Sequence, residues 1–174
     1  MHRRISKKIF IYLFILFTLG TLSNNRLQQF NLSKIDTIHI TGVQEFEKNQ
    51  IYQDLDNLKK MIANIKNCEL KKNAKNIVFA DGNPEAKIMF IGEGPGANED
   101  QEGIPFVGRA GILLDKMLAS INLNRENVYI TNVVNYRPPE NRKPTGEEIN
   151  RYLPYLKKHI EIINPKILVL LGST

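Results

Sequence analysis

Residues 87–111 read KIMFIGEGPGANEDQEGIPFVGRAG, and this stretch decides which fold the chain can adopt. It opens with the apolar run 88–91, whose length and composition predict a buried parallel strand. The run ends in the turn 92–96, where three glycines allow close backbone approach and Pro95 stiffens the chain. Ligands of open α/β sheets bind beyond the carboxyl ends of the strands, so we predict that the functional site lies at this turn.

The residues after the turn carry polar and aromatic groups suited to such a site. Pro105 and Gly108 flank the segment that holds Phe106, which predicts a rigid turn presenting the ring just before an apolar helix. A phosphate-binding loop is disfavoured, because no Lys or Ser/Thr follows the glycines. Four carboxylates lie close to the turn in the sequence: Glu93, Glu99, Asp100 and Glu102.

Strand and helix patterns alternate around this stretch. Residues 127–134 and 166–171 are rich in β-branched and apolar residues, so each predicts a further buried strand. Between them, Thr145 and Glu148 form a capping-box pattern at the start of a long helix. Residues 108–121 predict a helix with these side chains inward: Leu113, Leu114, Met117, Leu118 and Ile121. The β-α-β-α-β order predicts an α/β fold, a three-layer α/β/α sandwich around a short parallel sheet, incomplete at the C-terminus because no helix follows the last strand.

The N-terminal part of the chain divides into three segments. Residues 1–25 join a basic start to an apolar run, which fits either a signal-like segment or an apolar helix packed on the domain. Residues 26–49 are polar and weakly patterned, so we expect a linker. Residues 50–174 are expected to form one domain, which begins with a helix whose apolar stripe is Ile51, Leu55, Leu58, Ile62 and Ile65.

Composition and charge indicate a globular protein and exclude some kinds of metal site. The chain has 174 residues, 42% of them hydrophobic, and a net charge of +6. That charge fits attraction to a polyanion such as nucleic acid, or simply a solvated lysine-rich surface. Cys68 is the one cysteine, which excludes an internal disulfide and any all-cysteine metal site built from this chain alone. The histidines are far apart and show no ligand spacing: His2, His39 and His159.

Three ordered motifs carry a family resemblance: GEGPGANEDQEGIPFVGRAGILLDKML, VYITNVVNYRPPENRKP and YLPYLKKHIEIINPKILVLLG. Together, over about residues 67 to 172, they resemble the iron–sulfur (family 4 type) class of bacterial and archaeal uracil-DNA glycosylases. The resemblance implies a hydrolase of base-excision repair that acts on uracil-containing DNA and breaks the N-glycosidic bond of a flipped-out uracil.

The resemblance also implies roles for individual residues around the base. Phe106 matches the family's uracil-stacking aromatic, although a core position would also suit it. Asn132 matches the residue that reads the uracil edge, because an amide offers both a donor and an acceptor. Asn141 matches a further active-site asparagine, with a turn-forming role equally open. Gly94 belongs with these residues as part of the substrate-binding turn.

Glu93 and Glu99 match the family's carboxylates and are the expected catalytic residues. A carboxylate positions water and stabilises the positive charge that develops on the sugar. Glu99 alternatively excludes thymine by crowding its methyl group, and either glutamate fits a solvated loop charge. Three basic residues of the proline-rich loop suit contacts with DNA phosphates, with surface solvation as the other interpretation: Arg137, Arg142 and Lys143.

The chain departs from the family at the cluster that the family holds, a 4Fe-4S centre bound by four cysteine thiolates. Cys68 alone keeps a thiolate, because the other three positions are Ile65, Tyr136 and Tyr152. We therefore expect no cluster. We expect the two tyrosine rings to pack against each other in the space that the cluster would fill.

The second departure concerns the family's His-Pro loop, which follows the LLG strand and does not occur in this sequence. His159 is expected in a helix and does not replace that histidine. Two functions follow as alternatives: a glycosylase with weak activity or one completed by a separately encoded C-terminal part, and a truncated, non-catalytic remnant that binds nucleic acid at most. We expect a cytoplasmic protein, or an exported or membrane-anchored one if residues 3–22 act as a signal.

Overall fold

The computed structural model describes the backbone of residues 32–172 and the side chains of residues 43–172. The predicted segment 1–25 lies outside these residues. The chain divides into two compact units, Met1–Gln44 and Glu45–Thr174. The elements that position the site belong to the second unit. None of the helices in residues 32–172 is long and apolar enough to span a bilayer.

A four-stranded sheet with the order β1-β3-β2-β4 forms the centre of the second unit. Its strands are β1 (Ala80–Gly82), β2 (Ile88–Gly92), β3 (Tyr129–Asn132) and β4 (Ile167–Leu170). β2 runs parallel to both β3 and β4, whereas β1 runs antiparallel to β3. The three predicted strands are parallel, but the sheet as a whole is mixed because β1 was not predicted and runs in the opposite direction. The chain reverses in the turn between β1 and β2, where no crossover helix is present to keep the strand direction.

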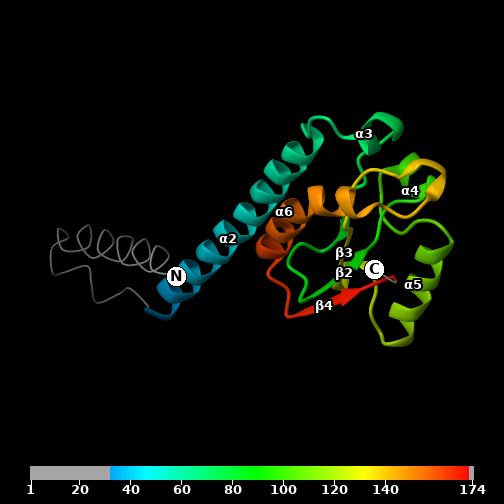
Figure 1. The fold of residues 1–174 in the computed structure, drawn as a ribbon. Coiled ribbons are helices and arrows are strands. Elements are labelled where there is room, and N and C mark those ends of the chain that lie inside the picture. The colour runs from blue at the N-terminus through cyan, green and yellow to red at the C-terminus, as the bar shows by residue number, and fades with distance from the viewer. Residues whose placement is uncertain (1–31, 173–174) are drawn as a thin grey trace. The chain divides into compact units, whose positions relative to one another are not determined.

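Helices cover both faces of this sheet (Figure 1). The α-helices are α2 (Leu32–Ala63), α3 (Glu69–Asn73), α4 (Ala97–Glu102), α5 (Arg109–Ser120) and α6 (Gly146–Ile163), of which α5 and α6 pack on opposite faces. Met89 and Ile91 belong to a core cluster that contains residues of α2 and α6. Phe90, which points to the opposite face of β2, packs in a second cluster with Leu114 and Leu118 of α5. The predicted α/β sandwich is thereby confirmed.

Helix α2 corrects the prediction of a linker over residues 26–49, because it begins at Leu32. No proline interrupts the sequence between residues 32 and 63, so a helix can propagate back from the strongly patterned part. In that patterned part, Leu55, Leu58 and Ile62 are buried as predicted.

Helix α6 begins at the predicted capping box. Glu148 N donates to Thr145 Oγ1 at 3.2 Å, and Thr145 N donates back to Glu148 Oε2 at 2.8 Å. The pair satisfies two backbone N–H groups that a helix start leaves without partners. Asn164, in the left-handed conformation at φ 47°, ends the helix.

Two predictions of burial were wrong. Leu114 and Leu118 of α5 are buried, but Leu113, Met117 and Ile121 are exposed, the last by 61%. Strand β4 was predicted to be buried, yet Leu170 is 67% exposed. Only one side of α5 packs on the sheet, and β4 is an edge strand that pairs with β2 alone among the described strands.

Candidate active site

The ends of β2 and β3 bring the two central residues of the site together. Gly92 ends β2 and lies directly beside Asn132 at the end of β3. A Cβ atom added to Gly92 would lie 2.4 Å from Asn132 Oδ1 and 2.5 Å from Phe106 Cζ. Both side chains therefore converge on the face of Gly92, and only glycine leaves room for this approach.

A cavity of about 370 Å³ opens at this point. Its volume is typical of sites that bind small molecules. Five of the predicted site residues line it: Gly94, Glu99, Phe106, Asn132 and Asn141. Sequence reasoning missed Asn98 and Arg109, which also line it, because neither falls at a position that its residue type distinguishes from ordinary helix surface.

Phe106 adopts an uncommon backbone conformation at this cavity. Its φ is 56°, in the left-handed region that a bulky residue rarely occupies. Such a conformation costs on the order of 1–3 kcal/mol and persists only where neighbouring contacts impose it. The Phe106 ring is half-buried, which fits a cavity wall better than the interior position that the sequence left open.

Glu99 connects the glycine turn to the segment that carries Phe106. Its Oε2 accepts a hydrogen bond from Gly96 N at 3.0 Å, and its Oε1 accepts one from Gly108 N at 2.7 Å. Both carboxylate oxygens therefore bind backbone N–H groups on either side of the cavity. The contacts indicate that Glu99 positions the cavity wall.

Glu93 lies in a different environment. Its Oε1 is buried and has no hydrogen-bond partner among the described residues. A buried carboxylate oxygen without a partner is energetically costly, and such groups occur at functional sites more than elsewhere. Glu93 is not among the described residues that line the cavity.

The two other acidic residues near the turn do not contribute to the cavity. Asp100 is buried, and its Oδ1 accepts hydrogen bonds from Lys75 N at 2.9 Å and Asn76 N at 3.2 Å. It therefore anchors the segment before β1, while Glu102 is exposed. Of the four carboxylates near the turn, only Glu99 lines the cavity in the described part of the chain.

The proline-rich loop after β3 holds the remaining predicted residues. Arg137 Nε donates to Asn141 Oδ1 at 2.8 Å, and Asn141 has a φ of 56°. Asn141 thus serves the turn and lines the cavity at once. Arg142 pairs with Glu148 at 2.7 Å, and Lys143 is exposed. Arg142 is exposed like Lys143, whereas Arg137 is half-buried against Asn141.

The four positions of the family's cluster come together in one buried core cluster, namely Ile65, Cys68, Tyr136 and Tyr152. Cys68 Sγ lies 3.3 Å from the Tyr152 hydroxyl. Burial, followed by the Cys68 contact, raises the pKa of Tyr152. One thiol and no second ligand of that type do not fit a four-thiolate cluster. Within residues 43–172, no three His, Cys, Asp or Glu side chains form a group that could hold a metal ion.

The predicted contact between the two tyrosine rings is not the one that forms. Among the described residues, the ring that packs on Tyr152 is that of Tyr155, with centroids 6.4 Å apart. Tyr136 is buried nearby, and burial followed by the Cys68 thiol raises its pKa. Both tyrosines therefore belong to one core cluster, and Tyr155 supplies the ring contact of Tyr152.

His159 lies in the core between α6 and the sheet. Its Nε2 lies 2.8 Å from the Tyr129 hydroxyl, and its ring stacks on Phe79 at 4.7 Å. Burial lowers the pKa of His159 to about 4. It is neutral near pH 7 and connects α6 to β3.

The fold and the cavity define an α/β protein with a candidate binding site at the carboxyl ends of two parallel strands. The chain belongs to the uracil DNA glycosylase superfamily, whose family model matches residues 79–174, more than half of its length.

Curated relatives agree with this assignment. The type-4 uracil-DNA glycosylase of Archaeoglobus fulgidus is 49% identical over 120 residues, which are 69% of this chain and 60% of the relative. The Sulfurisphaera tokodaii enzyme of the same name is 50% identical over 68% of this chain and 54% of its own. The Thermotoga maritima enzyme is 51% identical over 62% of this chain and 56% of its own. The chain thus spans somewhat more than half the length of these relatives.

Proposed function

We propose that this protein excises uracil from DNA by hydrolysing the N-glycosidic bond. One observation carries the proposal: the Phe106 ring and the Asn132 amide converge over Gly92 in a cavity at the ends of β2 and β3. A ring supplies a stacking face for a pyrimidine, and an amide pairs with its edge. The likeness to type-4 uracil-DNA glycosylases gives independent support.

In the proposed reaction the uracil leaves the duplex stack and enters the cavity beside Phe106. Asn132 reads the edge of the base, and backbone N–H groups of the glycine turn stabilise the negative charge on the departing uracil. Glu93 is the proposed carboxylate for the sugar and the water, since one of its oxygens has no hydrogen-bond partner among the described residues. Glu99 holds Gly96 and Gly108 and thereby shapes the cavity.

The proposed DNA contacts lie on the proline-rich loop. We propose that phosphates of the DNA backbone bind the three basic residues of this loop, Arg137, Arg142 and Lys143. The Arg142 guanidinium is 42% exposed and donates to both oxygens of Glu148, whose side chain is only 18% exposed, so a phosphate would share the guanidinium with that carboxylate. Because the proposed substrate is DNA, we propose a cytoplasmic location.

We propose further that the protein works without an iron–sulfur cluster. Cys68 is the single thiol among the four corresponding positions, and its sulfur already contacts the Tyr152 hydroxyl. No step of the proposed reaction involves a metal.

The experiment is incubation of the full chain with single-stranded DNA that contains one uracil, followed by alkali to cut abasic sites. We expect cleavage at uracil only, and strongly reduced but measurable cleavage in Asn132→Ala and Phe106→Ala. Arg151→Ala is the control, because Arg151 bonds Lys66 O outside the cavity. Absence of product at enzyme excess would contradict the proposal.

A second candidate is a protein that binds nucleic acid without excising a base. It is favoured by the commitment of both Glu99 oxygens to backbone N–H groups and by the absence of Glu93 from the described cavity lining. DNA binding that persists without cleavage, and that weakens in Lys143→Gln, would identify this function.

A further inference from the structure

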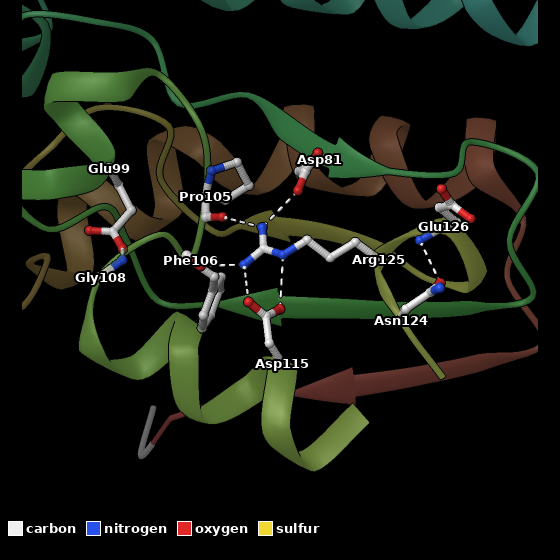
Figure 2. A network of polar contacts seen from close by, with 9 residues as sticks. All are labelled: Asp81, Glu99, Pro105, Phe106, Gly108, Asp115, Asn124, Arg125 and Glu126. Atoms are coloured by element: carbon white, nitrogen blue, oxygen red, sulfur yellow. Dashed lines mark hydrogen bonds and ion pairs between the residues drawn. The ribbon is translucent and has the colours of Figure 1, made fainter. Parts of the chain in front are cut away.

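Arg125 contacts the backbone of the Phe106 segment, which lines the cavity. The family motifs assigned Arg125 no role. It opens the short helical turn Arg125–Asn127, which Asn124 caps by accepting a hydrogen bond from Glu126 N at 3.0 Å. This cap fixes the backbone from which the Arg125 side chain extends under the Phe106 segment (Figure 2). The side chain is three-quarters buried.

Its guanidinium contacts four acceptors from three parts of the fold. Nη1 lies 2.7 Å from Asp81 Oδ2 of β1, and Nε lies 2.9 Å from Asp115 Oδ1 of α5. The same group donates to the Pro105 carbonyl at 3.1 Å and to the Phe106 carbonyl. Figure 2 shows the guanidinium between the two carboxylates and the two carbonyl oxygens. The aspartates therefore hold the guanidinium in the orientation that reaches both carbonyls.

The Phe106 backbone needs such a restraint. It is left-handed at φ 56°, and its carbonyl lies so close to α5 that a Cβ on Gly111 would come within 1.6 Å of the oxygen. On the other side of the ring, Glu99 accepts the hydrogen bond of Gly108 N. Arg125 and Glu99 thus fix the segment before and after Val107, and the direction of the Phe106 ring follows from them.

We propose that Arg125 is a positioning residue of the uracil site, which acts through the Pro105 and Phe106 carbonyls to keep the Phe106 ring beside Asn132. This inference rests on the proposed function for its consequence, the excision rate. Its physical core, the restraint of the Phe106 segment, stands apart from any reaction. Arg125 touches none of the reacting groups and is not a catalytic residue.

The first test compares Arg125→Lys and Arg125→Gln with the control Arg151→Gln. Lysine keeps the charge but cannot reach two carbonyls and two carboxylates with one ammonium group. We expect single-turnover excision to fall on the order of 10²-fold in both Arg125 variants, since small misplacements of a binding group have effects of that size. Full activity in Arg125→Lys would overturn the proposal, because charge alone would then suffice.

The second test is a double-variant cycle. If Arg125 acts through the ring, adding Arg125→Lys to the Phe106→Ala variant should leave the excision rate of that variant nearly unchanged. The same substitution should slow excision by the wild type. An undiminished effect in the Phe106→Ala background would show a general structural role and would overturn the proposal.

A third measurement needs no DNA. Hydrogen exchange of the Gly108 amide, which Glu99 protects, should be about tenfold faster in Arg125→Lys than in the wild type and unchanged in Arg151→Gln. Unchanged exchange in Arg125→Lys overturns the restraint. If the wild type excises no uracil, the proposed function fails, while this measurement still decides the role of Arg125. If Arg125→Gln does not fold, Arg125→Lys carries all three tests.

Discussion

At the scale of single residues, Gly92 sets how closely the Phe106 ring and the Asn132 amide approach each other. We predict that Gly92→Ala lowers uracil excision on the order of 10²-fold, because the added methyl group would meet both side chains within 2.5 Å. The free energy of unfolding should fall by about 1–3 kcal/mol, as for other overpacked sites. Both quantities can be measured on the same preparation, by single-turnover cleavage and by urea unfolding.

Gly146→Ala is the matched control for that change. A Cβ at Gly146 meets no atom within 4 Å, and the residue begins α6. The free energy of unfolding should rise by up to about 1 kcal/mol, and the excision rate should not change. Equal effects of the two substitutions would show that Gly92 serves stability alone.

The site residues divide according to how local their signal is. Phe106 and Asn132 could be predicted because each stands at the end of a recognisable strand or turn, and parallel strand ends meet at one edge of a sheet. Arg125 could not, since its four acceptors come from β1, α5 and the Phe106 segment. The role of Glu99 as a bridge also needed the structure, because its partners are backbone N–H groups.

At the scale of elements, His159 joins α6 to the sheet, and we predict that its burial makes the stability of the protein depend on pH. Burial lowers the pKa of His159 to about 4, from about 6.5 in an unfolded chain. Between these values the unfolded chain binds a proton that the folded protein does not. The free energy of unfolding is therefore retained above about pH 6.5 and decreases towards pH 4, by roughly 3 kcal/mol for this group.

We expect His159→Gln to flatten this dependence, because glutamine keeps a hydrogen-bonding group near the Tyr129 hydroxyl but does not titrate. Urea unfolding at several pH values from 4 to 7 measures the slope. Lys157→Gln, an exposed change on the same helix, should leave the slope as it is. An identical slope in His159→Gln and the wild type would assign the pH dependence to other groups.

Elements were predictable where their signal lies within a few residues. The capping box of α6 and the apolar run of β2 are of this kind, and both occur where expected. The direction of β1 was not predictable, because it depends on which strand β1 pairs with. The inward face of α5 was predicted wrongly. Apolar residues lie around much of that helix, but only a narrow stripe of them packs on the sheet.

At the scale of the whole molecule, the four positions that correspond to the family's cluster ligands lie packed in the core. Ile65, Cys68, Tyr136 and Tyr152 are buried in one cluster with residues of α2, α6 and the sheet. The sequence indicated which thiolates were absent, but the partners that now fill the core depend on how distant elements meet. Tyr152, for example, contacts Tyr155 and the Cys68 sulfur.

Stability should therefore depend on the Tyr152 ring and not on iron. We predict that Tyr152→Ala lowers the free energy of unfolding by about 3–5 kcal/mol, as for other large aromatic deletions. Tyr152→Phe should lower it by only about 1 kcal/mol, because the ring stays and a single hydrogen bond to Cys68 is lost. Urea unfolding of the wild type and of both variants measures the effect of the ring. Urea unfolding of the wild type before and after treatment with an iron chelator measures the effect of iron. Stoichiometric iron in the purified chain, or a wild-type transition that shifts on chelation, would show that the core holds a metal centre after all.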